Sequence, residues 1–373
     1  MNKCKLGDVA SVIISNVDKK SYENEIKVKL CNFTDVYYNW AITLRDEPKL
    51  MIATATNNEI CKYKLHKGDV AITKDSETKE DIGQSTLIAD EIPDMLLGYH
   101  CALIRPNTDK LLGAYLNAVL HTKLATRYFE LNASGSGQRY TLSVDAINDF
   151  QLYLPSINEQ ERISKILTDI DRKIENNTCI NDNLQQVIKS CFDFMFATRK
   201  PNGIISDIMQ EYPKSTIQVN DSTGVLGDYP FFTSGEAINE WQSALVDGMN
   251  CYLSTGGNAT IKGYYGKAAY STDTWCVCGK GEYSFYLFCY LKSIIRSIND
   301  SFFAGSGLKH LQKDSLLLVN LYIPSGKELE KFNSIVKPAM ETMTKLFLET
   351  KKLKQQRDFL LPLLMNGQAT IAE

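Results

Sequence analysis

An internal repeat constrains the fold of this 373-residue chain more than any other feature of its sequence. The sequence LYLPSINEQE at 152–161 returns as LYIPSGKELE at 321–330, with six of ten residues identical and an offset of 169 (321 − 152). Just upstream, the Gly-Ser-Gly at 135–137 matches the Gly-Ser-Gly at 305–307, with an offset of 170. The chain is therefore predicted to contain two copies of one structural unit.

After each copy of this segment, the sequence changes to a long heptad pattern, which we call the seam. In the first copy the seam runs through Ile163, Leu167, Ile170, Ile174, Asn177, Asn181, Leu184, Ile188, Cys191 and Met195. Adding 169 gives Phe332, Val336, Ala339, Met343, Leu346, Thr350, Leu353, Arg357, Leu360 and Leu364. The pattern predicts helices at 156–197 and 326–366, each about 60 Å long at 1.5 Å per residue.

We predict that these two helices pair as an antiparallel coiled coil, because an ordinary globular helix of about 12 residues needs no stripe of this length. The alternative is that each stripe packs only against its own globular domain. In an antiparallel pair, the polar seam residues Asn177, Asn181 and Thr350 would meet near the middle and fix the register. Pro338 is expected to bend the second helix or to delay its start.

The length predicts two domains at about 150 residues each, and the repeat places them at 1–155 and 198–325, with a tail at 367–373. Each domain is expected to contain short strands and one apolar helix, at 111–124 and 283–298. Strands expected to be half-buried follow the turns at 67–69 and 247–248. The predicted fold class is α+β: two repeated α/β domains joined by two long helices and related by an approximate twofold axis.

Loops in both domains concentrate basic, amide, hydroxyl and aromatic side chains, the types that read base edges and hold phosphates. The candidate DNA-binding residues are Tyr38, Lys74, Ser76, Lys79, Tyr99, His100, Gln138, Arg139 and Tyr140 in the first copy, and Ser234, Ser254, Asn258, Thr260, Lys262, Tyr265, Lys309 and His310 in the second. The alternative for any single loop is a solvated turn. The net charge of −3 excludes a generally basic DNA-coating protein but not a basic groove.

Signals of catalysis and of bound metal are weak. The ten cysteines are scattered, and Cys276 and Cys278 have no second pair at zinc-ligand spacing. The turn at 303–307 imitates a methyltransferase cofactor loop but lacks the catalytic Asn/Asp-Pro-Pro-Tyr, and Asp69 with Glu77-Thr78-Lys79 imitates a nuclease triad that the second copy lacks. No segment reads as a leader or a spanning helix. We therefore predict a soluble, cytoplasmic, non-catalytic protein.

The order of these elements resembles the specificity subunit of type I restriction-modification systems. The resemblance rests on the segments 135–140, 154–163 and 167–174, on the second helical region at 355–367, and on 68–74, which is similar to a strand and loop of that family's target recognition domains. The second copy departs from the pattern, with Glu328-Leu329-Glu330-Lys331 in the place of Glu-Gln-Glu-Arg.

This resemblance implies a DNA-sequence reader that is not itself an enzyme and binds no cofactor. Each domain would read one part of a bipartite, asymmetric site in double-stranded DNA, and the helices would set the unread gap. Two modification subunits would supply S-adenosylmethionine binding and adenine methylation, and restriction subunits could add ATP-dependent translocation and cleavage. The alternatives are a scaffold that binds proteins through its repeated halves, and a self-sufficient methyltransferase or nuclease.

Overall fold

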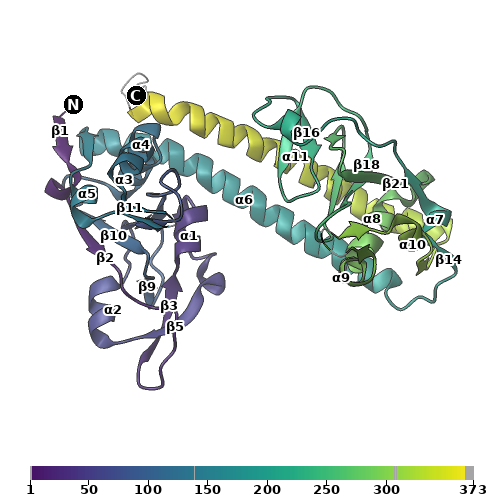
Figure 1. The fold of residues 1–373 in the computed structure, drawn as a ribbon, viewed down its shortest axis with the longest axis horizontal. Helices are drawn as coiled ribbons and strands as arrows, with labels where there is room; N and C mark the ends of the chain where they lie inside the picture. The colour runs from purple at the N-terminus through teal and green to yellow at the C-terminus, as the bar shows by residue number, and fades with distance from the viewer. Residues whose placement is uncertain (1, 138, 306, 308, 366–373) are drawn as a thin grey trace. The chain divides into compact units, whose positions relative to one another are not determined.

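The computed structural model describes residues 2–137, 139–305, 307 and 309–365, and the chain divides into two compact units (Figure 1). The first unit comprises Met1–Ile174 and Lys352–Glu373, and the second comprises Glu175–Lys351. Both units mix helices and strands, as the sequence predicts. The candidate residue Gln138 and the predicted tail at 367–373 lie outside the described residues.

The first unit is built on a five-stranded sheet in the order β2-β10-β6-β8-β4, with smaller sheets β5-β3-β9, β11-β12-β7 and β1-β13. Its elements are β1 (Asn2–Lys5), β2 (Ala10–Ile14), β3 (Ile26–Cys31), α1 (Phe33–Tyr38), β4 (Ala41–Ile42), β5 (Met51–Ala55), α2 (Asn57–Tyr63), β6 (Val70–Thr73), β7 (Asp75–Ser76), β8 (Ser85–Ile88), β9 (Met95–Leu97), β10 (Cys101–Pro106), α3 (Gly113–Leu120), α4 (Lys123–Asn132), β11 (Ser134–Ser136), β12 (Arg139–Thr141), α5 (Val144–Asn148) and β13 (Gln151–Leu154).

The strand expected to be half-buried after the turn at 67–69 is β6, and it is buried along its whole length, so that expectation is wrong. Val70 and Ile72 belong to one hydrophobic core, whereas Ala71 belongs to another. Successive side chains of a strand point to opposite faces. Both faces of the sheet are therefore covered at β6.

The second unit has sheets in the orders β15-β21-β18-β19, β17-β16-β20, β14-β24 and β22-β23. Its elements are β14 (Gly203–Ile204), α7 (Ile205–Ile208), β15 (Met209–Glu211), β16 (Tyr229–Phe232), β17 (Ile238–Trp241), β18 (Met249–Ser254), β19 (Ile261–Tyr265), β20 (Ala269–Tyr270), β21 (Thr274–Gly279), α8 (Ser284–Ser293), α9 (Ile295–Ser301), β22 (Phe303–Ala304), β23 (His310–Leu311), α10 (Lys313–Leu317) and β24 (Asn320–Leu321). Strand β18, which follows the turn at 247–248, is also fully buried rather than half-buried.

The sequence repeat corresponds to a repeated construction in the two units. The strand that precedes each proline pairs antiparallel with the first strand of its unit, β13 with β1 and β24 with β14. A tyrosine of the apolar helix then bonds to this strand: the hydroxyl of Tyr115 donates to the carbonyl of Tyr153 at 3.0 Å, and that of Tyr286 donates to the carbonyl of Tyr322. The two units therefore share this strand pairing and this tyrosine hydrogen bond.

Each copy satisfies the carbonyl of its proline in a different way. Gln160 is fully buried, and its side chain donates to the carbonyl oxygens of Pro155 and Lys110 and accepts from the amide of Leu112. The corresponding residue of the second copy is Leu329, which cannot form these bonds. There the hydroxyl of Tyr283 donates to the carbonyl of Pro324 at 3.1 Å.

Replacing Gln160 with alanine should lower the free energy of unfolding by about 3 kcal/mol, because it leaves buried backbone groups without partners. The measurement is urea denaturation of the purified chain. Glu161→Ala is the matched control, because the neighbouring Glu161 is exposed and its loss should cost less than about 0.5 kcal/mol. Equal midpoints for the two variants would contradict this role for Gln160.

The long helices α6 (Ile157–Phe196) and α11 (Gly326–Met365) occupy the ranges in which the heptad pattern predicts them. All twenty seam side chains are buried or partly buried. In the first unit, Ile163 and Leu167 of α6 share a core with Leu361 and Leu364 of α11. In the second unit, Ile188 of α6 shares a core with Phe332 and Val336 of α11. Each of these cores also contains residues from the sheets and short helices of its unit. The apolar stripe of each long helix therefore packs both against the other long helix and against the rest of the unit.

Of the three polar seam residues, Asn177 and Thr350 meet as predicted. The side-chain amide of Asn177 is fully buried and donates to Glu349 Oε2 at 2.9 Å and to Thr350 Oγ1 at 3.3 Å. Its own oxygen, like that of Asn181, is buried without a protein partner within the described residues. A hydrogen-bonded asparagine inside an apolar seam fixes the register of two helices at some cost in stability.

We expected Pro338 either to bend α11 or to delay its start. The expected delay is wrong. Helix α11 begins at Gly326 and continues through Pro338, and also through Pro362. An interior proline costs about 3 kcal/mol. On the same helix Phe332 and Val336 are fully buried, and burying such side chains contributes about 1.5–3 kcal/mol each. The apolar stripe therefore outweighs the loss of one backbone hydrogen bond.

Candidate nucleic-acid interface

In the first unit, the small sheet β11-β12-β7 brings together predicted site residues from distant parts of the sequence. Ser76 on β7 pairs with Tyr140 on β12, and Arg139 pairs with Ser136 across the β11–β12 hairpin. Gly135 permits this hairpin, because its φ is +134° and a Cβ at this position would lie 2.2 Å from the carbonyl oxygen of Arg139. The close approach of the two hairpin strands therefore explains why a glycine stands at position 135 of the repeat.

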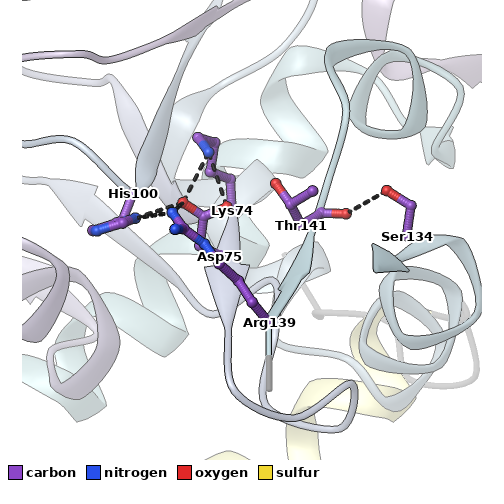
Figure 2. A network of polar contacts seen from close by, with 6 residues as sticks. All are labelled: Lys74, Asp75, His100, Ser134, Arg139 and Thr141. Carbon is purple, nitrogen blue, oxygen red and sulfur yellow. Dashed lines mark hydrogen bonds and ion pairs between the residues drawn. The ribbon is translucent and has the colours of Figure 1, made fainter. Parts of the chain in front are cut away.

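A buried carboxylate organises the cations of this sheet (Figure 2). Asp75 accepts from Lys74 Nζ at 2.9 Å, lies 2.5 Å from His100 Nδ1 and 3.4 Å from Arg139 Nη2. The Asp75 side chain is 9% exposed, whereas that of Arg139 is 68% exposed. One buried acid thus contacts three basic side chains, of which Arg139 is the most exposed. The sequence alone predicts Lys74, Ser76 and Lys79 of this loop as contacts, but not Asp75.

The environment of Asp75 keeps it charged. Burial alone would raise the pKa of this carboxyl, but hydrogen bonds from His100, Lys74 and Thr141 outweigh burial and hold the pKa of Asp75 well below its usual range. His100 adopts a left-handed backbone conformation, with φ of +72°, which is uncommon for a residue other than glycine. The strain at His100 is therefore maintained by the contacts around Asp75.

Aromatic rings surround the same cluster. The ring of Tyr99 lies 3.9 Å from that of His100, and Lys79 Nζ lies 5.3 Å from the centre of the Tyr140 ring. Tyr38, at the end of α1, is 77% exposed. Its neighbour Tyr37 donates to Asp81 in the loop between β7 and β8 at 2.5 Å. Apart from Gln138, the first-copy candidates therefore lie either in this cluster or, in the case of Tyr38, on helix α1, which the bond from Tyr37 to Asp81 connects to the loop between β7 and β8.

In the second unit, a backbone hydrogen bond joins the two loops that correspond to the β7 and β12 segments of the first unit. In the first unit the amide of Leu142 donates to the carbonyl of Lys74, and in the second the amide of Leu311 donates to the carbonyl of Thr255. Gly256 and His310 form a bridge in the place of Ser76 and Tyr140. Lys309 and His310 are exposed beside this bridge, as is Asn258. The structure therefore assembles corresponding loops in both copies.

Several second-copy candidates form contacts within their own unit. Ser254 is buried, and its hydroxyl donates to the carbonyl of Asn258 and accepts from the amide of Thr260. Lys262 Nζ donates to the carbonyls of Thr233, Gly235 and Ala237, and the hydroxyl of Thr260 donates to the backbone carbonyl of Ser234. The ring of Tyr265 packs against Phe285 at 5.5 Å. The polar groups of the Ser254, Thr260 and Lys262 side chains thus have partners inside the protein, and these side chains shape the loops.

The resemblance to a nuclease triad has no support in the geometry. Both carboxylate oxygens of Asp69 accept from Arg105, at 2.9 and 2.7 Å. Among the described residues, no group of three or more His, Cys, Asp or Glu side chains is arranged to hold a metal ion.

Within the same described part of the chain, no helix has the length and apolar composition needed to cross a bilayer.

Comparison with known proteins places this geometry in a family. The family model described as "Type I restriction modification DNA specificity domain" matches residues 1–186. The type I restriction enzyme HindI specificity subunit of Haemophilus influenzae is 26% identical over 202 residues, which cover 52% of this chain and 40% of that protein. The MjaIX specificity subunit of Methanocaldococcus jannaschii is 20% identical over 308 residues, covering 71% of each chain.

The fold also matches a solved structure. The crystal structure of the type I restriction-modification system S subunit from M. genitalium has a TM-score of 0.63 at 12% identity, covering 100% of this chain and 96% of that one. The alignment with the Haemophilus influenzae relative covers 40% of that relative, so the chain spans less than half of its length. The chain belongs to the family of type I restriction-modification DNA specificity proteins.

Proposed function

We propose that this chain is the DNA-reading subunit of a type I restriction-modification complex, with one reading surface in each unit. The observation that carries the proposal is the repeated connection of strands, which presents Lys74, His100 and Arg139 in one copy and Lys309 and His310 in the other. Basic and amide side chains on strand ends and hairpins can contact phosphates and base edges. Two unlike surfaces of this kind suit a bipartite, asymmetric site.

The two long helices would act as a spacer in this proposal. We infer that α6 and α11 pair as an antiparallel coiled coil that keeps the two reading surfaces at a fixed separation, with the bonds of Asn177 setting the register. Half-sites on one face of DNA recur with each turn of about 34 Å. A stiff pair of helices therefore suits an unread spacer of constant length between two half-sites.

Catalysis would come from partner proteins. The relatives are named as specificity subunits of type I restriction enzymes. We propose that two modification subunits dock on this chain and supply S-adenosylmethionine and adenine methylation, and that restriction subunits can join them. The chain itself would need no cofactor. The competing proposal, a scaffold that binds only proteins, predicts no DNA sequence preference in a mobility-shift titration with the modification subunit present.

Replacing Lys309 with alanine tests whether the second reading surface touches DNA. If Lys309 contacts one phosphate, the variant should bind DNA more weakly, and the slope of log affinity against log salt should become shallower by about 1. The measurement is a salt titration of the complex with its modification subunits. Lys327→Ala is the control, because Lys327 is an exposed lysine at the start of α11, away in sequence from both loops. An unchanged slope for Lys309→Ala would remove Lys309 from the interface.

A further inference from the structure

A hollow of about 650 Å³ opens beside the second reading surface. It is lined by Thr255 and His310, which belong to the paired loops described above, and by Glu211, Lys214, Trp275 and Lys313. Of these residues, only His310 is among the candidates that the sequence predicts. The hollow is therefore continuous with the proposed interface but extends it to new side chains.

Glu211 is held in one orientation at the rim of this hollow. It is the last residue of β15 and pairs with Val277 on the adjacent strand β21. Trp275 Nε1, on a side chain that is 3% exposed, donates to Glu211 Oε2 at 2.8 Å. An indole N–H is a donor only, so it fixes one carboxylate oxygen and cannot compete for the other. The residue itself is exposed, which leaves its carboxylate accessible from outside.

Two lysines, Lys214 and Lys313, line the same hollow as Glu211. Lys313 Nζ lies 4.6 Å from the centre of the Trp275 ring, so the same indole contacts both Glu211 and Lys313. Burial lowers the pKa of Lys313, with Glu211 opposing and Lys214 adding to this shift. The hollow therefore presents one fixed acceptor together with two lysine side chains, and His310 lines the same hollow.

This arrangement is suited to reading a base. A carboxylate repels DNA phosphates, so it is tolerated on a DNA-binding surface where it accepts hydrogen bonds from base donors. Glutamate accepts from the exocyclic amino group of cytosine in the major groove, and adenine offers an amino group at a similar depth. Neighbouring lysines offset the repulsion by contacting phosphates on either side.

We propose that Glu211 is a specificity-determining residue that accepts a hydrogen bond from the exocyclic amino group of one base in the second half-site, while Lys214 and Lys313 contact the flanking phosphates. This inference rests on the proposed function of the chain as a DNA reader. Beyond that function, it names the chemical group that the second unit recognises, an amino group in the major groove. It places this recognition at the end of strand β15.

The test compares Glu211→Ala, Glu211→Gln and the unaltered chain, each in complex with its modification subunits, by selecting bound sequences from a DNA library with randomised half-sites. In Glu211→Ala, preference at one position of one half-site should fall by about 10- to 100-fold, with the other half-site unchanged. Glu211→Gln retains an acceptor for Trp275, so it should fold normally. Its preference should change at the same position, because an amide both donates and accepts.

Asp314→Asn is the matched control, because it removes a nearby exposed negative charge that acts on the same lysine. It should leave every base preference unchanged. Identical preferences for both Glu211 variants and the unaltered chain would overturn the inference but not the proposed function. A loss of affinity that is equal for all sequences would also overturn it, since Glu211 would then act only on folding or charge. No sequence preference in the unaltered complex would overturn both.

Discussion

Replacing Asp75 with alanine is expected to lower the free energy of unfolding by about 3 kcal/mol and to abolish sequence-specific DNA binding. The variant leaves Lys74, His100 and Arg139 close together without the carboxylate that neutralises them, and removing one partner of a buried ion pair costs about 3–5 kcal/mol. The measurements are urea denaturation and a mobility-shift titration. Asp149→Ala is the matched control, because its ion pair with Lys5 at 2.7 Å is about half exposed, and it should cost less than about 1 kcal/mol.

The effect of Asp75→Ala should also depend on pH. The pKa of Asp75 is lower in the folded chain than the usual value of about 3.9 for an unfolded chain. A carboxyl of this kind contributes its full stability above that unfolded value and loses it as the pH falls through the lower, folded value. The stability difference between the unaltered chain and Asp75→Ala should therefore be constant from pH 7 to 5 and shrink below about pH 4. A difference that stays constant to pH 3 would show that lost packing, rather than lost charge, causes the destabilisation.

Lengthening both helices by three heptads is expected to lengthen the unread spacer of the DNA site by about nine base pairs. The insertions belong after Ile174 in α6 and after Lys351 in α11, where the two units divide, so that the contacts within each unit are retained. At 1.5 Å per residue, 21 residues add about 32 Å, which is close to one turn of DNA at about 34 Å. The second half-site therefore returns to nearly the same face of the duplex. Sequencing of methylated sites would measure the spacer.

A single-heptad insertion in both helices is the control for this experiment. It adds about 10 Å, or about three base pairs, which rotates the second half-site by roughly 100° around the DNA axis. Methylation should then be lost or strongly reduced, although the seam stays in phase. An unchanged spacer after the three-heptad insertion would contradict the role of the helices as a ruler.

The repeat and the long helices could be predicted because they depend on patterns that one sequence displays directly. The offset of 169 and the heptads locate α6 and α11, and the meeting of Asn177 with Thr350 follows from antiparallel pairing. Pro338 misled the prediction of the helix start, because local propensity is overridden when an apolar stripe is buried.

The candidate sites were harder to predict, because residue type does not reveal which way a polar side chain bonds. Lys262 and Ser254 have the composition expected of DNA contacts, yet both satisfy backbone groups of their own loops. Asp75 looked like one acid in a charged loop, and its burial depends on strands β10 and β12 from elsewhere in the sequence. Such pairings are set by tertiary structure and leave no local signal.

The different partners of Pro155 and Pro324 have a consequence for how this duplicated chain can change. Gln160 donates a hydrogen bond to the carbonyl of Pro155, and Tyr283 donates one to the carbonyl of Pro324. The two halves therefore satisfy the corresponding carbonyl with different side chains. A glutamine transferred to position 329 would enter a site that is only 5% exposed, where the proline carbonyl is already occupied. Exchanging this single residue between the halves is therefore not expected to transfer the bonding arrangement, because Gln160 also bonds to Lys110 and Leu112 of its own unit.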